Sequence, residues 1–200
     1  MAERRSLKAL REEVHGCRRC DLWKPATQAV FGEGLRRARI MLVGEQPGEK
    51  EDLAGRPFVG PAGRELDRGL EEAGIDRKDA YVTNVVKHFK FEERGRRRIH
   101  QTPKRFEIDA CSVWLDGELE LVAPEALVLL GATAAKALLG SSFRVTRHRG
   151  ELLDSELAPI VAATIHPSAI LRAPDDASRQ AERRAFAEDL GTVASALARA

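Results

Sequence analysis

The sequence lacks long apolar stretches. No apolar run approaches the ~20 residues that a membrane-spanning helix needs, and the best candidate, residues 126–140, is short and contains Lys136. Residues 1–14 (MAERRSLKALREEV) lack the apolar core of a signal peptide. These absences argue against an integral membrane protein, and we expect a cytoplasmic protein with no membrane partner.

Two common nucleotide-binding signatures are also missing. The chain contains neither a GxGxxG turn nor a P-loop lysine motif, which argues against a nucleotide-binding Rossmann domain. The formal net charge of +2 does not by itself indicate nucleic-acid binding. The charge is unevenly distributed, however, because residues 87–105 contain eight basic residues against two acidic ones. Such a segment predicts a polyanionic ligand, and a merely solubilising loop is the plainer alternative.

The composition is that of an ordinary globular protein, with 43% hydrophobic and 32% charged residues. We therefore expect one domain over residues 1–200. Short apolar runs predict buried parallel strands at residues 38–43, 80–86, 126–130 and 160–165. Helical periodicity lies between and after them at residues 62–73, 106–122 and 178–198. This alternation predicts a three-layer α/β/α fold with a central, mostly parallel four-stranded sheet.

Unusual residues lie at or just beyond the carboxyl end of each predicted strand. They are GEQPG (residues 44–48), Asn84, GAT (residues 131–133) and HPS (residues 166–168). Ligands of open α/β sheets bind at the carboxyl ends of the strands. The four clusters should therefore meet in one crevice.

The three cysteines, Cys17, Cys20 and Cys111, do not suit a disulfide framework. Pairing two of them leaves one over, and disulfides are typical of secreted proteins. A C-x-x-C pair with a distant third cysteine indicates a metal or cluster site that lacks one ligand. Any of the five histidines is a candidate for that place, and both zinc and an iron–sulfur cluster remain open.

Four ordered blocks make the sequence resemble a known family. They are CRRCDL (residues 17–22), GEQPGEKEDLAGRPFVGPAGRELD (residues 44–67), YVTNVVKHFK (residues 81–90) and IHPSAILR (residues 165–172). The resemblance is to the iron–sulfur uracil-DNA glycosylases of family four and covers nearly the whole chain. RRRIH (residues 96–100) and GEQPG, where ordinary members tend to have GEAPG, resemble the UdgX branch. Members of that branch become covalently joined to uracil-containing DNA.

The resemblance implies a [4Fe–4S] cluster. The ligands carried over are Cys17, Cys20, His88 and Cys111, where His88 takes the place of the fourth cysteine of ordinary family-four enzymes. From residue types alone, His88 would be interpreted as an exposed residue in a basic segment. The implied role of the cluster is to order DNA-facing loops.

The resemblance also implies how uracil is held. Phe58 would stack on the base, and Asn84 would bind N3–H and O4, a pattern that cytosine reverses. Gly44 would let the backbone approach the base, and the backbone amide of Gln46 would contact it. His166 would donate to O2 as negative charge develops there.

The remaining residues would act on the sugar and the backbone. Glu45 would stabilise the oxocarbenium ion, orient a water molecule or take a proton from His100. The resemblance implies that Arg96, Arg97 and Arg98 contact phosphates. From residue types alone, phosphate contact is the favoured role for His100, whereas the RRRIH signature implies attack of its imidazole on the sugar.

The predicted protein is therefore a monomeric glycosylase that excises uracil from DNA and becomes linked to the abasic sugar through His100. Its partners would be uracil-containing DNA and uracil. The sequence also allows two alternatives. One is an ordinary turnover glycosylase in which His100 only contacts DNA. The other is a zinc-stabilised nucleic-acid-binding module without catalysis.

Overall fold

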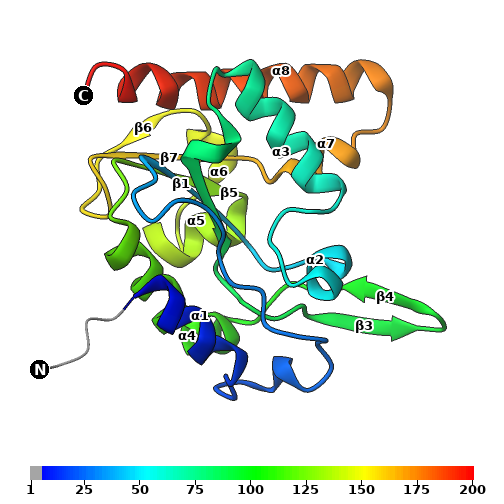
Figure 1. The fold of residues 1–200 in the computed structure, drawn as a ribbon. Helices are drawn as coiled ribbons and strands as arrows, with labels where there is room; N and C mark the ends of the chain where they lie inside the picture. Colours follow the sequence, from blue (N-terminus) through cyan, green and yellow to red (C-terminus); the bar gives the residue numbers. More distant parts are fainter. Residues whose placement is uncertain (1–5) are drawn as a thin grey trace, which may run out of the picture.

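A five-stranded sheet forms the centre of the computed structural model, which describes residues 6–200 (Figure 1). Across the sheet the strands are β2 (Ala80–Asn84), β1 (Ile40–Gly44), β5 (Ala126–Leu130), β7 (Ile160–Thr164) and β6 (Leu152–Leu153). The first four are parallel and confirm the predicted strands. The fifth, β6, pairs antiparallel with β7 and is too short to show in a sequence pattern.

The parallel strands are apolar because both of their faces are covered. Every residue of β1, β2 and β5 is buried. Successive side chains of a strand point to opposite faces, so Met41 and Val43 enter one hydrophobic cluster while Ile40 and Leu42 enter the other. The two clusters make the core of a three-layer fold, as predicted.

Helices cover the two faces separately (Figure 1). One face carries α1 (Leu7–His15), α4 (Arg105–Val122) and α5 (Ala132–Leu139). The other carries α3 (Pro61–Glu72), α7 (Pro167–Leu171) and α8 (Asp176–Leu197). The remaining helices are η1 (Asp21–Trp23), α2 (Glu49–Ala54), η2 (Arg77–Asp79) and α6 (Val145–His148).

The arginine-rich segment forms a β-hairpin rather than the loop expected from its sequence. Strand β3 (Phe91–Arg94) pairs antiparallel with β4 (Arg97–His100). Gly95 makes the tight turn possible because its φ of 62° lies in the left-handed region that favours glycine. The hairpin projects from the sheet beside α2 (Figure 1), and it presents His100 at the end of a strand.

No helix within residues 6–200 is long and apolar enough to cross a membrane. The sequence analysis expected no signal peptide in residues 1–14, and residues 1–5 of that segment lie outside the described residues.

Candidate active site

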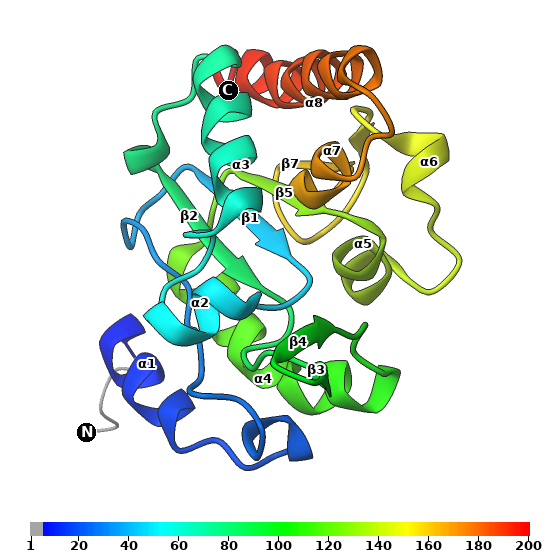
Figure 2. The same ribbon diagram turned by 90° about the vertical axis from the view of Figure 1, so that its right-hand side faces the viewer.

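The carboxyl ends of the parallel strands open into a cavity of about 700 Å³. The hairpin, α5 and α7 surround this edge of the sheet (Figure 2). All four predicted clusters contribute to the lining of the cavity, through Glu45, Gln46, Asn84, Gly131, Thr133 and His166. His100 from the hairpin also lines it. The sequence segments thus converge because parallel strands end at the same edge.

Gly44 leaves the floor of the cavity free for a flat ligand. A Cβ atom added to Gly44 would lie 2.4 Å from Asn84 Oδ1 and 2.8 Å from Phe58 Cζ. The rings of Phe58 and His166 face each other with centroids 6.0 Å apart and an interplanar angle of 28°. A side chain at Gly44 would therefore fill the space between Phe58 and Asn84, the residues that the sequence analysis assigned to the base.

The backbone of Phe58 is held in a costly conformation. Its φ of 55° is unusual for a residue with a large side chain. Helix α3 packs directly against it, since a Cβ atom on Gly63 would lie 1.7 Å from the Phe58 carbonyl oxygen. This packing aims the Phe58 ring into the cavity.

Asn84 ends β2 and offers an unused amide. It is only 3% exposed, and within residues 6–200 its side-chain amide has no protein hydrogen-bond partner and is reached from the cavity that it lines. Buried amides are normally paired. The amide therefore suits a ligand with a complementary donor and acceptor.

His166 caps α7 through one ring nitrogen and leaves the other for the cavity. Its Nδ1 accepts the backbone N–H of Ser168 at 3.1 Å and lies 2.8 Å from the Ser168 hydroxyl. Burial lowers the pKa of His166 to about 4, so the ring is neutral and its single proton belongs on Nε2. That N–H is directed toward the cavity floor near Gly44.

Glu45 and His100 form a pair at the side of the cavity. His100 Nε2 lies 2.8 Å from Glu45 Oε1, and the Thr133 hydroxyl donates to Glu45 Oε2. Burial pushes the pKa of Glu45 upward, but the hydrogen bonds from His100 and Thr133 outweigh it and leave this pKa below its ordinary value. Glu45 is therefore a carboxylate beside a half-exposed imidazole.

The side chain of Gln46 fastens the hairpin. Its Oε1 accepts the Lys90 N–H at 3.0 Å, and its Nε2 donates to the carbonyls of Lys90 and Gln101 at 3.2 and 3.1 Å. The same Nε2 lies 3.2 Å from His100 Nδ1. Sequence reasoning assigned only the Gln46 backbone amide and missed this side-chain role.

The three arginines of the hairpin differ in their surroundings. Arg96 and Arg97 are exposed. The side chain of Arg98 is 18% exposed, and its guanidinium lies 2.7 Å from Asp52 and 3.3 Å from Glu49 on α2. Arg98 therefore anchors the hairpin to α2, and the phosphate contact predicted for it stays a prediction.

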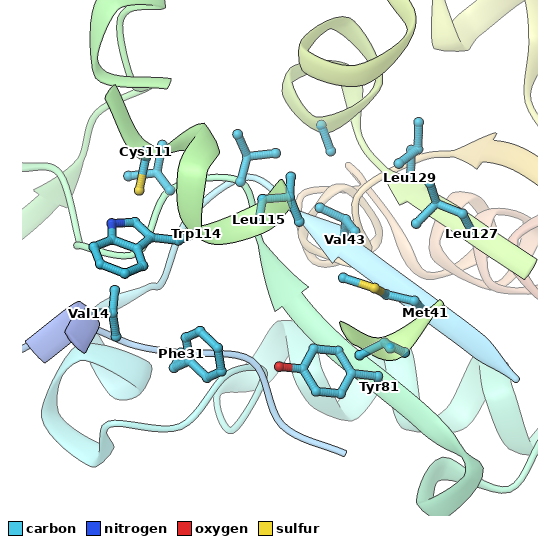
Figure 3. Close-up of a cluster of buried hydrophobic side chains, with 14 of the residues drawn as sticks. Val14, Phe31, Met41, Val43, Tyr81, Cys111, Trp114, Leu115, Leu127 and Leu129 are labelled. Carbon is cyan, nitrogen blue, oxygen red and sulfur yellow. The ribbon is translucent and has the colours of Figure 1, made fainter. Parts of the chain in front are cut away.

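Cys111 lies on α4 beside Trp114 (Figure 3), and the hydrophobic cluster that contains it also contains Cys17, with Cys20 packed against it. Trp114 Nε1 donates to Cys17 Sγ at 3.2 Å, and the Lys87 N–H donates to Cys111 Sγ at 3.3 Å. Burial, with smaller contributions from Cys17 and Cys20, raises the pKa of the Cys111 thiol to about 11 although Lys87 acts in the opposite direction.

His88 is buried rather than exposed. Burial lowers its pKa to about 4, with a further contribution from Arg18 inside the C-x-x-C segment. A neutral imidazole is the form that binds metal. Within residues 6–200, no three His, Cys, Asp or Glu side chains are close enough to hold a single metal ion.

Comparison with known proteins agrees with this arrangement. A sequence model of the uracil DNA glycosylase superfamily matches residues 31–191, which include the cavity and all four parallel strands. This chain belongs to the uracil DNA glycosylase superfamily. Within it, the chain is 40% identical over 178 residues to the type-4 uracil-DNA glycosylase of Sulfurisphaera tokodaii, covering 85% of this chain and 78% of that protein.

Two further members of the superfamily show the range of the likeness. The type-4 uracil-DNA glycosylase of Thermotoga maritima is 41% identical over 162 residues, covering 80% of this chain and 81% of the relative. The type-5 uracil-DNA glycosylase of Pyrobaculum aerophilum is 30% identical over 180 residues, covering 81% and 75%.

Three residues near the cavity were not singled out by the sequence analysis. Thr133 binds Glu45, Ser168 orients His166, and Lys87 bonds to the Asn84 carbonyl. Each belongs to a residue type that is common on any protein surface. Only their position in the fold distinguishes them, although GAT and HPS marked the right segments.

Proposed function

We propose that this protein removes uracil from DNA and then becomes covalently joined to the abasic sugar through His100. The pairing of His100 with Glu45, 2.8 Å apart at the side of the cavity, carries this proposal. An ordinary hydrolase needs open space for water beside the carboxylate, and here an imidazole occupies it. The type-4 and type-5 relatives, which are named uracil-DNA glycosylases, support the first half of the proposal.

Recognition begins when the base leaves the helix stack and enters the cavity. Phe58 provides an aromatic surface for stacking, and the unused amide of Asn84 supplies an acceptor for N3–H and a donor for O4. Cytosine presents the opposite donor and acceptor pattern at these positions. Its N3 and N4 would leave the Asn84 amide mismatched, which disfavours binding.

Cleavage of the N-glycosidic bond transfers its electron pair to the base and leaves an oxocarbenium ion on the sugar. The Nε2–H of His166 donates to O2 of the departing uracil anion. The Glu45 carboxylate stabilises the sugar cation, which is possible because its pKa lies below the ordinary value. No proton transfer from His166 is required for this step.

His100 then captures the cation. The ring nitrogen that holds the lone pair bonds to C1′ of the sugar, and the ring becomes a positively charged imidazolium that retains one N–H. The Glu45 carboxylate, its hydrogen-bond partner, accepts the hydrogen bond from that N–H and balances the new positive charge. The oxocarbenium ion is consumed, so no water molecule enters and the protein stays attached.

Arg96 and Arg97 suit the phosphates on either side of the flipped nucleotide, because both are exposed on the hairpin that carries His100.

We also propose that Cys17, Cys20, His88 and Cys111 hold a [4Fe–4S] cluster. Three soft sulfur donors, a neutral imidazole and two N–H groups directed at sulfur suit such a group. The bound cluster would supply structural order between the N-terminal segment and α4.

A denaturing gel tests the covalent step. Wild-type protein incubated with a uracil-containing oligonucleotide should release one uracil per protein and migrate as a protein–DNA adduct. Mass spectrometry should then place the sugar on the peptide that contains His100. His148→Gly serves as a matched control, because His148 is an exposed histidine paired with Glu151 outside the cavity.

Each alternative predicts a different result. Repeated uracil release without an adduct would identify a turnover glycosylase. Zinc without iron or sulfide in anaerobically purified protein, together with no uracil release, would identify a nucleic-acid-binding module. Loss of the adduct in His148→Gly would reassign the nucleophile.

A further inference from the structure

A buried lysine lies directly behind the base-binding asparagine. The side chain of Lys87 is completely buried, as is that of its partner Glu118 on α4. The Lys87 ammonium lies 2.5 Å from Glu118 Oε2, 2.7 Å from Thr83 Oγ1 and 2.7 Å from the main-chain carbonyl of Asn84. All three donors of the ammonium group are therefore used.

The carboxylate of Glu118 is equally well satisfied. It accepts the Gly32 N–H at 2.8 Å, the Tyr81 hydroxyl at 2.9 Å and the Thr83 hydroxyl at 2.9 Å. Burying two charges is expensive even when they are paired, and apolar or neutral replacements of such pairs are often no less stable. Stability alone therefore gives a weak reason for an ion pair at this position.

The contact to Asn84 suggests another role. The peptide unit between Asn84 and Val85 is held on both edges: the Val85 N–H donates to the Gly44 carbonyl at 2.9 Å, and the Asn84 carbonyl accepts from Lys87. This peptide unit lies at the last residue of β2, where the ladder with β1 ends. Without Lys87, the Asn84 carbonyl would have no partner among the described residues, and the peptide unit would be held on one edge only, by the Val85–Gly44 hydrogen bond.

We propose that Lys87 is a positioning residue for uracil recognition. By fixing the main chain of Asn84, its ammonium holds the Asn84 amide against the cavity in the orientation that matches N3–H and O4. This inference rests on the proposed reading of uracil by Asn84, and it adds a specificity-determining residue that never touches the base. Glu118 holds Lys87 in place.

The test separates positioning from stability with a neutral double variant. Lys87→Met with Glu118→Gln removes both charges, while the glutamine retains an acceptor for Gly32 and Tyr81 and a donor for Thr83. The single variant Lys87→Met should melt at a lower temperature, because Glu118 is left as an unpaired buried charge. The double variant should recover the wild-type melting temperature to within a few degrees. Lys87→Leu with Glu118→Gln is a second neutral pair in case the first does not fold.

Two measurements are made on each protein: calorimetric binding of free uracil, and uracil release from an oligonucleotide with the protein in excess. In the double variant, the dissociation constant for uracil should rise about tenfold, which corresponds to about 1.4 kcal/mol or roughly one hydrogen bond. The half-saturating protein concentration for uracil release should rise with it. Tyr81→Phe is the control, because it removes a Glu118 hydrogen bond and leaves the Lys87 contact to Asn84 intact. Its uracil binding should equal that of the wild type.

The outcomes are distinguishable. A stable double variant that binds uracil as tightly as the wild type would show that Lys87 is only structural, and the inference would be wrong. Wild-type protein that binds uracil without releasing it from DNA would refute the proposed function. The calorimetric comparison of wild type and double variant would then still decide whether Lys87 positions Asn84. Wild-type protein that neither binds uracil nor releases it from DNA would overturn both.

Discussion

Replacing His100 by glycine is expected to convert a self-capturing protein into a turnover enzyme. The substitution removes the imidazole that bonds to C1′, and it leaves the floor of the cavity formed by Phe58, Asn84 and His166 unchanged. The oxocarbenium ion would still form beside Glu45, which keeps its hydrogen bond from Thr133. Water entering the vacated space would then react with the sugar and release the DNA.

The structure sets the size of these effects. The His100 side chain is 51% exposed, and its removal makes room for about two water molecules of roughly 30 Å³ each. Glycine near the end of β4 should cost about 0.5–1 kcal/mol, which lowers the melting temperature by roughly 1–4 °C for a chain of this size. The first-turnover rate of uracil release should remain within about tenfold of wild type, a barrier change of up to about 1.4 kcal/mol.

The assay measures adduct and free uracil in the same samples. Wild type should stop at one uracil per protein, whereas His100→Gly should form no adduct and continue to release uracil under excess DNA. His100→Ser repeats the test without the flexibility of glycine. An undiminished adduct in either variant would refute the assignment of His100, and an adduct mapped to another residue would do the same.

Four further predictions follow from the same geometry. His166→Ala should slow uracil release by about 10²–10³-fold, as measured in single-turnover experiments, because it removes the donor to O2; an unchanged rate would exclude this donor. Since the folded-state pKa of His166 is about 4, below its unfolded value of about 6.5, its contribution to stability is present above pH 6.5 and is lost as pH falls. Urea titrations should therefore show that lowering the pH from about 7 to 5 costs the wild type about 2 kcal/mol more than it costs His166→Ala, and equal losses would contradict the burial argument. Arg97→Ala should weaken binding to DNA and reduce its salt dependence by about one counterion, while Arg98→Ala should instead loosen the hairpin from α2, seen as faster amide exchange in β3 and β4. His88→Cys should retain iron and sulfide in anaerobically purified protein because thiolate is the commoner cluster ligand, and zinc alone would refute the cluster.

Much of the fold could be predicted from local patterns. Strands that are buried on both faces must be continuously apolar, and residues 126–130 form a strand with the predicted bounds. Helix α3 ends before Gly74, whose φ of 73° suits the residue that follows a helix. The β3–β4 hairpin escaped prediction because its exposed strands carry charged side chains on both faces, which leaves no hydrophobic alternation to detect.

The candidate site was predictable in its parts but not in its contacts. Residue types and their positions after strands pointed to Glu45, Asn84 and His166, because parallel strands bring their ends together. The partners of these residues depend on side-chain distances between segments far apart in the chain. Thr133 is 88 residues from Glu45, and no pattern in either segment specifies their hydrogen bond.

By itself, the sequence determined the alternating α/β architecture, the edge of the sheet that carries the site and the family resemblance, since these depend on periodicity and on the order of motifs. Only the tertiary structure decided what each charged side chain does. Arg98 turned out to be paired with Asp52, whereas Arg96 and Arg97 are exposed, and Lys87 is completely buried against Glu118 and Asn84. The physical reason is that the role of a charge depends on its distance from an opposite charge and from water, and packing sets both distances.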